Sequence, residues 1–396
     1  MTEEMPTRFG KCVVTKRLGR GATAHVYLAT HEGLGIRVAV KVLRRELSEK
    51  RPRYAERFLR EARTAAWLEH PNIVRVIDCG IQDGLHYMVM DYADGPNCLQ
   101  MLRNNPRGLD WREATGIIRQ VATGLAYAAE HDVIHRDIKP SNIIVDQDGR
   151  ARITDLGLAK LTIKGLTDLT QELHTVGTPN YMSPEQIRSS QKLDLRSDIY
   201  SLGASFYHMV VGQTPYSGKN PMEVVAKHLT AQLAPPLERK PDLPASLSST
   251  ICKMMAKAPA DRYQDYETLR EDLQNLLAGK TTTAEGFRDV QLTDDEQEEL
   301  RRALEQLQLK AELDEEEPAP APEPAPPLLT ESQIRTFDAG EFDAYKPPEP
   351  EYNQAELKRR GIAWEQRVMG LLWTLVALGV LALVVVLLVA FLYSNR

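Results

Sequence analysis

The sequence predicts an α+β protein of two lobes, a β-rich lobe followed by a larger α-rich lobe, with a disordered linker and one C-terminal transmembrane helix behind them. Three observations support this fold class. Short segments of strand-like composition, such as CVVTKRL, HVYLAT and RVAVKVL, come first. After Leu99, apolar residues recur at helical spacing, as in WREATGIIRQVATGLAYAAEH. The run VMGLLWTLVALGVLALVVVLLVAFLY near the C-terminus carries no charge.

Composition divides the chain into regions. Residues 8–279 mix strand and helix patterns without a linker-like break, so we interpret them as one two-lobed domain. Residues 280–315 contain TDDEQEELRRALEQLQLKAEL, which predicts one short amphipathic helix. Residues 316–361 include a Pro/Ala/Glu tract whose prolines lack the amide hydrogen that helix or sheet requires. This region is expected to be a disordered, solvated linker.

The uncharged run at 368–393 is 26 residues long. At about 1.5 Å per residue it can cross a hydrocarbon core of roughly 30 Å. A buried core helix is the alternative, but no globular sequence follows for it to pack against. Four basic residues precede the run against one after it, which predicts that the N-terminal side is cytoplasmic and the C-terminus outside. These residues are Lys358, Arg359, Arg360 and Arg367, against Arg396. We therefore expect a single-pass protein of the cell membrane, bound to the lipid bilayer by this helix.

Charge and cysteine content exclude several function classes. The net charge is -6, with acidic and basic residues interspersed, so nucleic acid is not expected as a partner. The four cysteines are far apart in the sequence and form neither CxxC pairs nor a cluster typical of zinc sites or disulfide frameworks. A reduced cytoplasmic compartment fits best, and the N-terminus MTEEMPTRFGK lacks the apolar core of a secretory signal peptide.

Three features of the first lobe favour nucleotide binding, although each alone has an ordinary structural explanation. The segment LGRGATAHV lies between two strand-like segments, where its glycines would let backbone amides approach phosphates. Lys41 ends the apolar segment Val38-Ala39-Val40 and supplies the cation that phosphates need. Glu61 lies on a helical stretch from which it can pair with Lys41. A simple hairpin, an exposed lysine and a surface glutamate are the alternative interpretations.

A dense polar segment in the second lobe suggests an active-site loop. His135-Arg136-Asp137-Ile138-Lys139-Pro140-Ser141-Asn142 is flanked by apolar residues, and Asp155 follows in the segment TDLG. Asn142 and Asp155 offer hard oxygen ligands that suit Mg²⁺. A charge clamp, a metal and a positioned hydroxyl are what phosphoryl transfer requires.

In their order and spacing these segments resemble the eukaryotic-type protein kinase family over roughly residues 8–279. The resemblance implies ATP and Mg²⁺ as cofactors, with Asp137 as the catalytic aspartate and Lys139 on the γ-phosphate. Lys41 would bind the α- and β-phosphates with Glu61 as its partner, and Asn142 and Asp155 would bind magnesium. The implied nucleotide contacts are Leu18, Gly19, Gly21 and Ala24 of the Gly-rich loop, Val26, Ala39 and Ile144 around the adenine, Met90 as gatekeeper, and the backbone of Asp91 and Ala93.

The resemblance also implies supporting pairs and shows three departures. Glu185 would pair with Arg262, and Asp198 would brace the catalytic loop. Ala24 replaces the third glycine of the loop, Leu156 the Phe of DFG, and Ser183 the Ala of APE. None of these removes a reacting group, so activity is expected to survive.

The motif D-x-K-P-x-N, with Lys139, and the segment GTPNY, with Thr178 near Asp137 and Lys139, resemble the Ser/Thr branch of the family. The sequence style is most similar to bacterial transmembrane Ser/Thr kinases. Substrates would be proteins with Ser or Thr hydroxyls. Two other functions are weighed: a membrane-tethered pseudokinase scaffold, which usually loses the equivalents of Lys41, Asp137 or Asp155, and a small-molecule kinase, which the substrate-docking segment GTPNYMSPE disfavours.

Regulation is expected at the activation segment, which runs from Asp155 to Glu185. Arg136 beside Asp137 would accept a phosphate partner, for which Thr170 is the first candidate and Thr175 the second, with ordinary loop threonines as the alternative. The membrane helix and the linker would favour encounters between two copies and phosphorylation in trans within a transient homodimer. Apolar spacing from Leu300 to Leu313 would add weak pairing, or else form a solitary solvated helix.

Overall fold

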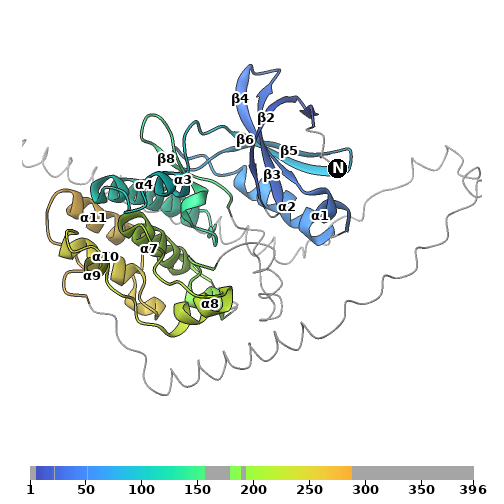
Figure 1. Ribbon diagram of the computed structural model, residues 1–396. Coiled ribbons are helices and arrows are strands. Elements are labelled where there is room, and N and C mark those ends of the chain that lie inside the picture. Colours follow the sequence, from blue (N-terminus) through green and yellow to red (C-terminus); the bar gives the residue numbers. More distant parts are fainter. Residues whose placement is uncertain (1–5, 22, 51, 157–178, 189–192, 288–396) are drawn as a thin grey trace, which may run out of the picture. The chain divides into compact units, whose positions relative to one another are not determined.

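The structure is a computed structural model and describes residues 6–21, 23–50, 52–156, 179–188 and 193–287 (Figure 1). The chain divides into two units, residues 1–319 and 320–396, and every described residue belongs to the first. Among the described residues, none of the helices has both the length and the hydropathy that a membrane span needs. The predicted span at 368–393, the linker and the amphipathic stretch at 300–313 lie outside the described residues.

The N-terminal lobe is a six-stranded antiparallel sheet with two helices (Figure 1). The strand order is β1-β2-β3-β4-β6-β5. The bounds are Arg8–Phe9 for β1, Cys12–Arg20 for β2, Ala24–His31 for β3, Ile36–Leu43 for β4, Val76–Gln82 for β5 and Leu85–Asp91 for β6. Helices α1 (Arg45–Lys50) and α2 (Pro52–Ala65) connect β4 to β5, and α2 packs against β5 and β6.

Strand β4 shows how the sequence divides the two faces of this sheet. Successive side chains of a strand point to opposite faces. Val38, Val40 and Val42 belong to one apolar cluster, with Phe9 and Tyr27. Ala39 and Leu43 belong to a second cluster that includes Phe58 and Ala62 of α2. Lys41 therefore points to the face that carries helix α2.

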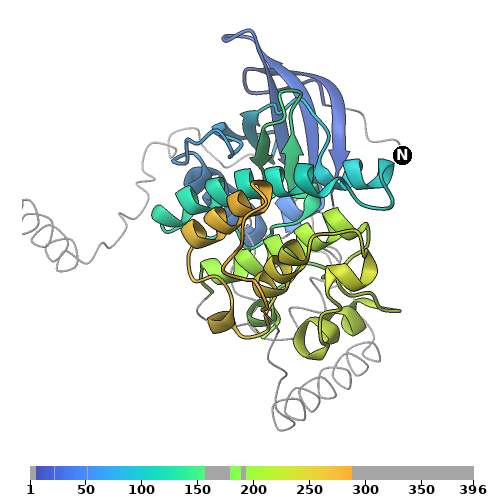
Figure 2. The same cartoon turned by 90° about the vertical axis from the view of Figure 1, so that its left-hand side faces the viewer.

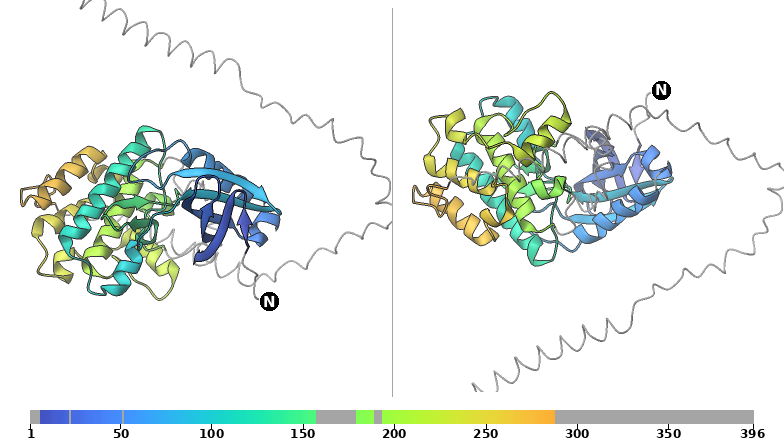
Figure 3. Two further views of the ribbon diagram at one scale, coloured as in Figure 1. Left: turned by 90° about the horizontal axis from the view of Figure 1, so that it is seen from above. Right: turned by 90° about the horizontal axis from the view of Figure 1, so that it is seen from below.

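The C-terminal lobe is built on helices α4 (Trp111–Glu130), α7 (Leu195–Val211) and α11 (Tyr266–Leu277), and α4 packs against both α7 and α11 (Figures 2 and 3). Helix α4 begins where the Asp110 side chain accepts hydrogen bonds from the N–H groups of Arg112 and Glu113. Helix α7 ends at Gly212, which has the left-handed backbone that favours glycine (φ 82°). The described residues also form helices α3 (Cys98–Asn104), α6 (Pro184–Ile187), α8 (Pro221–Thr230), α9 (Pro236–Arg239) and α10 (Ala245–Met254), with 3-10 turns at Pro140–Asn142 and Pro259–Asp261.

A small hairpin of β7 (Ile143–Val145) and β8 (Ala151–Ile153) lies within this helical lobe and ends next to the polar residues noted above. Its backbone is joined to the N-terminal lobe, because the N–H of Val74 donates to the carbonyl of Ile153 at 2.8 Å. Gly95 passes so close to the hairpin that a Cβ atom there would lie 1.9 Å from the carbonyl oxygen of Val145.

Residues beyond α11 are packed onto the C-terminal lobe as far as Phe287. The buried carboxylate of Asp272 accepts hydrogen bonds from the N–H and the hydroxyl of Thr283, at 2.8 and 2.7 Å. Ala284 is fully buried, and Phe287 contacts the main apolar cluster of this lobe. The packed structure thus continues for eight residues past position 279, where the sequence pattern placed the domain's end.

Candidate active site

Lys41 lies between two carboxylates. Its Nζ atom is 3.3 Å from Oε1 of Glu61 and 2.8 Å from Oδ1 of Asp155. The alternation of β4 directs Lys41 toward α2, which carries Glu61, and Asp155 follows strand β8. The Lys41 and Glu61 side chains are only 14% and 7% exposed, so this contact is shielded from water.

The electrostatics of this cluster follow from burial and charge pairing. Burial alone would lower the pKa of Lys41, but Asp155 and Glu61 outweigh burial and raise it. For Asp155, burial would raise the pKa, and Lys41 more than offsets this, so the pKa lies below its usual value. For Glu61, burial is the larger effect and the pKa is raised, although Lys41 opposes it. Lys41 is therefore a firmly protonated cation, which is the state that binds phosphate.

The loop before Asp137 is fixed by Asp198 of helix α7. The buried carboxylate of Asp198 accepts hydrogen bonds from the N–H groups of His135 and Arg136, at 2.7 and 2.8 Å. Arg136 has a left-handed backbone (φ 64°), which is uncommon for a residue other than glycine. Burial lowers the pKa of His135 to about 4, so its ring is neutral near pH 7, and Nε2 lies 3.1 Å from the carbonyl oxygen of Thr154.

The side chains of Lys139 and Asn142 both donate to the carboxylate of Asp137. Lys139 Nζ donates to Oδ2 of Asp137 at 2.8 Å. The amide of Asn142 donates to the same Oδ2 at 3.2 Å and to the backbone carbonyl of Asp137 at 2.9 Å. A carboxylate that accepts from a cation and an amide is held in one orientation while it keeps acceptor capacity for a substrate hydroxyl. The arrangement suits a group that positions a hydroxyl and accepts its proton.

The two predicted magnesium ligands are neighbours through the backbone. The N–H of Thr154 donates to the carbonyl of Asn142 at 3.0 Å, and Asp155 is the next residue. Asp155 also has a left-handed backbone (φ 59°), and its side chain is 35% exposed. The described residues contain no cluster of three or more His, Cys, Asp or Glu side chains with metal-binding geometry. Two oxygen ligands fit Mg²⁺, which is usually bound by one or two protein groups together with phosphates and water.

The Gly-rich segment forms the hairpin between β2 and β3. Gly19 pairs with Val26 across the two strands. At the turn, the N–H of Gly21 donates to the carbonyl of Ala24 at 2.8 Å. Leu18 is 39% exposed, so it offers apolar surface on the hairpin. The predicted contacts Leu18, Gly19, Gly21 and Ala24 therefore lie together on one hairpin.

The residues predicted to surround an adenine ring come from both lobes and share one apolar cluster. Ala39, Met90 and Ala93 are buried in this cluster, and Val26 and Ile144 pack against it. Asp91 follows Met90 at the end of β6, and its N–H donates to the carbonyl of Arg75 at 2.9 Å. Of its two backbone polar groups, Asp91 therefore has the carbonyl oxygen left for a nucleotide. The carbonyl of Ala93 accepts from the N–H of Gly95 at 3.2 Å, which leaves the N–H of Ala93 as the group to face a ligand.

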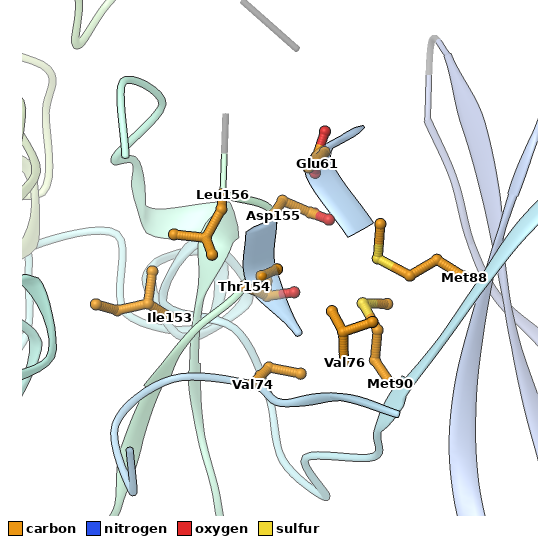
Figure 4. A pocket seen from close by; sticks show the side chains of 10 residues that line it. Glu61, Val74, Val76, Met88, Met90, Ile153, Thr154, Asp155 and Leu156 are labelled. Carbon is orange, nitrogen blue, oxygen red and sulfur yellow. The ribbon is translucent and has the colours of Figure 1, made fainter. Parts of the chain in front are cut away.

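A small cavity is lined by Met90 and by residues of both lobes (Figure 4). Its volume is about 10 Å³, which is close to the minimum for a single water molecule. The apolar lining comes from both lobes, and Glu61 and Asp155 lie at its edge. The lining residues are Glu61, Ala65, Val74, Val76, Met88, Met90, Ile153, Thr154, Asp155 and Leu156. Leu156, at the place of the family's Phe, is buried here.

Glu185 of helix α6 and Arg262 form a largely buried ion pair. Two guanidinium nitrogens of Arg262 donate to the Glu185 carboxylate at 2.6 and 3.0 Å. The Ser197 hydroxyl also donates to Glu185, at 2.7 Å. Burial would raise the pKa of Glu185, but the hydrogen bonds and charge of Arg262 outweigh it and lower the pKa.

Some predicted residues lie outside the described residues, and some contacts have no signal in the sequence motifs. Thr178, Thr170 and Thr175 fall in the undescribed segment 157–178. The motif pattern did not single out Gln186, whose side-chain amide donates to the carbonyl of Arg136 at 2.8 Å. A Gln three residues after Ser183 matches the capping-box pattern at a helix start, and this spacing is the one sequence feature that singles out Gln186.

Comparisons with known proteins agree with this geometry. The family described as "Protein kinase domain" matches residues 12–273. Serine/threonine-protein kinase PrkC of Bacillus subtilis is 33% identical over 295 residues, covering 74% of this chain and 44% of PrkC. Serine/threonine-protein kinase PknF of Mycobacterium tuberculosis is 38% identical over 278 residues, covering 68% of this chain and 57% of PknF.

Solved structures give the same result. The crystal structure of the Mycobacterium tuberculosis PknI kinase domain aligns with a TM-score of 0.54 and 28% identity, over 68% of this chain and 99% of that domain. The matches to PrkC and PknF span about half the length of those relatives. The sheet and helix arrangement, the ordered motifs and the family match together establish that this chain belongs to the protein kinase family.

Proposed function

We propose that the chain is a membrane-anchored Ser/Thr protein kinase that transfers the γ-phosphoryl group of ATP to Ser or Thr hydroxyls of proteins. The main observation in support of the proposal is the carboxylate of Asp137, to which two side chains donate hydrogen bonds. It accepts from Lys139 at 2.8 Å and from Asn142 at 3.2 Å, on a loop whose backbone Asp198 holds. The curated relatives named above are serine/threonine-protein kinases, which supports the choice of hydroxyl.

Each side chain has a role that follows from its environment. Lys41, kept protonated by its two carboxylate neighbours, would bind the α- and β-phosphates. Asp137 would orient the substrate hydroxyl and accept its proton, and Lys139 would move from Asp137 to the γ-phosphate as charge develops there. Asn142 and Asp155 would hold Mg²⁺, which when bound neutralises phosphate charge. Thr178 is proposed to stand near Asp137 and Lys139, as in the Ser/Thr branch.

The nucleotide base would lie between the two lobes. Val26, Ala39 and Ile144 supply apolar contacts from one cluster, and Met90 limits the depth of the site. The carbonyl of Asp91 and the N–H of Ala93 would pair with the adenine edge. Leu18, Gly19, Gly21 and Ala24 would cover the phosphates, since the β2–β3 hairpin brings backbone N–H groups to that side.

A substitution of Asp137 tests the proposed chemistry against the pseudokinase alternative. Asp137→Asn removes the proton acceptor but keeps the shape, so phosphorylation of a protein substrate with ATP and Mg²⁺ should fall by about 10²-fold or more. Asp148→Asn is the matched control, because Asp148 is an exposed aspartate on the nearby β7–β8 turn. Retention of most activity by a folded Asp137→Asn protein would exclude the assigned mechanism, and an inactive wild type would favour the pseudokinase.

Autophosphorylation of the activation segment forms part of the proposal. Nε of Arg136 is buried, and no acceptor within the described part of the chain lies in hydrogen-bond reach of it. A phosphate is a strong acceptor for such a guanidinium. We place it on Thr170 first and Thr175 second. Mass spectrometry of active protein should find one of them phosphorylated, and a fully active preparation without phosphate in the segment would refute this part.

Membrane attachment is proposed for residues 368–393, with a domain at 8–279, a juxtadomain segment at 280–315 and a linker at 316–361. The support is the uncharged 26-residue run and the proline content before it. Deletion of residues 362–396 should release the kinase from membranes with its chemistry intact, while autophosphorylation becomes steeply dependent on protein concentration. Loss of all activity at every concentration would show that the segment belongs to the catalytic machinery.

A further inference from the structure

The side chain of Gln186, on helix α6, contacts the catalytic loop (residues 135–142). The helix starts at Ser183, whose hydroxyl accepts from the N–H of Gln186 at 3.3 Å. In return, the Oε1 atom of Gln186 accepts from the N–H of Ser183 at 2.9 Å. This reciprocal pair is a capping box, so it fixes the Gln186 side chain in one orientation.

The other half of the same amide group reaches the catalytic loop. Nε2 of Gln186 donates to the carbonyl oxygen of Arg136 at 2.8 Å, across 50 positions of sequence. That carbonyl belongs to the peptide unit that joins Arg136 to Asp137. Because a peptide unit is planar and rigid, a hydrogen bond to its oxygen restricts the orientation of the next residue's backbone.

Arg136 has a left-handed backbone (φ 64°), a conformation that must be maintained by its surroundings. On one side, the carboxylate of Asp198 accepts from the N–H of Arg136 at 2.8 Å. On the other side, Gln186 donates to its carbonyl. The two contacts come from different elements, and together they hold both polar groups of the Arg136 backbone immediately before Asp137.

Helix α6, which carries Gln186, is itself held in place by hydrogen bonds. Its neighbour Glu185 accepts from Arg262 at 2.6 and 3.0 Å and from Ser197 at 2.7 Å. The Ser183 hydroxyl lies 3.1 Å from that of Ser197. Helix α6 is thus joined to α7 and to the segment before α11, so a displacement of the activation segment's end would be transmitted to Gln186.

We infer that Gln186 is a positioning residue for Asp137, and that it couples the order of the segment at Ser183–Gln186 to the orientation of the catalytic carboxylate. The inference rests on the proposed function, because it requires Asp137 to act in phosphoryl transfer. Its effect is on the placement of a reacting group, so it belongs to turnover rather than to the binding of ATP or substrate.

Gln186→Glu separates the cap from the contact with the loop. A glutamate at this position can still accept from the N–H of Ser183, since Glu serves in capping boxes as Gln does. Its second oxygen has no proton to donate to the Arg136 carbonyl near pH 7 and repels it. Gln186→Leu removes both contacts at similar volume. Ser183→Ala is the matched control, because it removes the cap hydroxyl and keeps the amide that reaches Arg136.

The test measures steady-state kinetics and thermal midpoints of these variants as full chains, with ATP, Mg²⁺ and a protein substrate. Gln186→Glu should lower kcat by about 10- to 100-fold, with both KM values within about twofold and a thermal midpoint close to wild type. Ser183→Ala should lower the midpoint more than Gln186→Glu does, with a smaller effect on kcat.

Two outcomes would overturn the inference. One is a kcat for Gln186→Glu within about twofold of wild type. The other is a loss of kcat that merely follows the loss of thermal stability across all three variants. Asp137→Asn, assayed in parallel, keeps the proposed function distinguishable: if it is inactive while Gln186→Glu is fully active, only the positioning role fails, whereas an active Asp137→Asn refutes the proposed function itself.

Discussion

The ion pair between Glu185 and Arg262 permits a quantitative test of what stabilises the C-terminal lobe. The Arg262 side chain is 0% exposed and that of Glu185 is 14% exposed. Arg262 also donates to the carbonyls of Ala256, Lys257 and Arg196, at 2.7, 2.9 and 2.9 Å. Glu185→Gln would leave the buried guanidinium without a counter-charge, which costs about 3–5 kcal/mol of the free energy of unfolding. For a domain of this size, that corresponds to a thermal midpoint lowered by roughly 5–9 °C.

A double-mutant cycle measures the pair itself. Arg262→Met should destabilise the protein at least as much as Glu185→Gln, because it strands a carboxylate and three carbonyl groups. The double variant should lose less than the sum of the two, by about 1–3 kcal/mol, because no unpaired charge remains. Denaturant unfolding of the full chain at neutral pH provides the free energies.

The matched control is an exposed pair of similar length. Lys227 Nζ is 2.7 Å from Oε1 of Glu223, with both side chains more than a third exposed. Glu223→Gln should therefore barely change the midpoint, since solvent screens such pairs. The reasoning fails if Glu185→Gln costs less than about 1 kcal/mol, the value typical of surface pairs. Lowering the pH should also destabilise the wild type as Glu185 is protonated, because its pKa is depressed in the folded state and the stabilisation is lost as the pH falls through that pKa.

Two further predictions follow from the geometry of single residues. Gly95→Ala would place a Cβ atom 1.9 Å from the Val145 carbonyl oxygen and should destabilise the folded protein by about 3 kcal/mol. Gly116→Ala lies inside helix α4 with nothing within 4 Å of the added Cβ atom, so it should stabilise the folded protein by roughly 0.5–1 kcal/mol. Thermal unfolding of both variants measures these changes. Burial raises the pKa of Asp198 to about 6, although the nearby backbone N–H donors lower it, so the folded state binds this proton more tightly than the unfolded state does. The wild type should therefore lose about 3 kcal/mol relative to Asp198→Asn as the pH rises from about 4 to about 7, and equal pH profiles in denaturant titrations would refute this.

The broad fold and the pairing of Lys41 with Glu61 could be predicted from the sequence, because both depend on local periodicity. Alternation along β4 sets the face of Lys41, and the helical pattern around Glu61 places an acid opposite it. The order of motifs then restricts the topology, and the family match confirms the two-lobed kinase fold.

Other contacts depend on tertiary approach and have no signature in the sequence. The 2.8 Å contact of Asp155 with Lys41 depends on a left-handed backbone at Asp155, and no residue pattern predicts that conformation. The contact between Gln186 and Arg136 joins positions 50 apart through a carbonyl, a group that every residue carries. Side-chain motifs predict which charged groups meet, whereas the hydrogen bonds that orient them depend on backbone atoms that the motifs do not encode.

The position of Lys41 between two anions has a thermodynamic consequence for ligand binding. A phosphate that binds Lys41 must compete with Asp155, whose Oδ1 atom is 2.8 Å from Nζ of Lys41. If Asp155 bound a divalent cation, it would compete less for Lys41, and if Lys41 bound a phosphate, Asp155 would be more available to the cation. Nucleotide and metal should each raise the affinity of the other by the same factor, as linkage requires and as nucleotide titrations at several Mg²⁺ concentrations would measure. Lys41 thus shares one positive charge between two carboxylates, and this sharing couples the binding of nucleotide to the binding of metal.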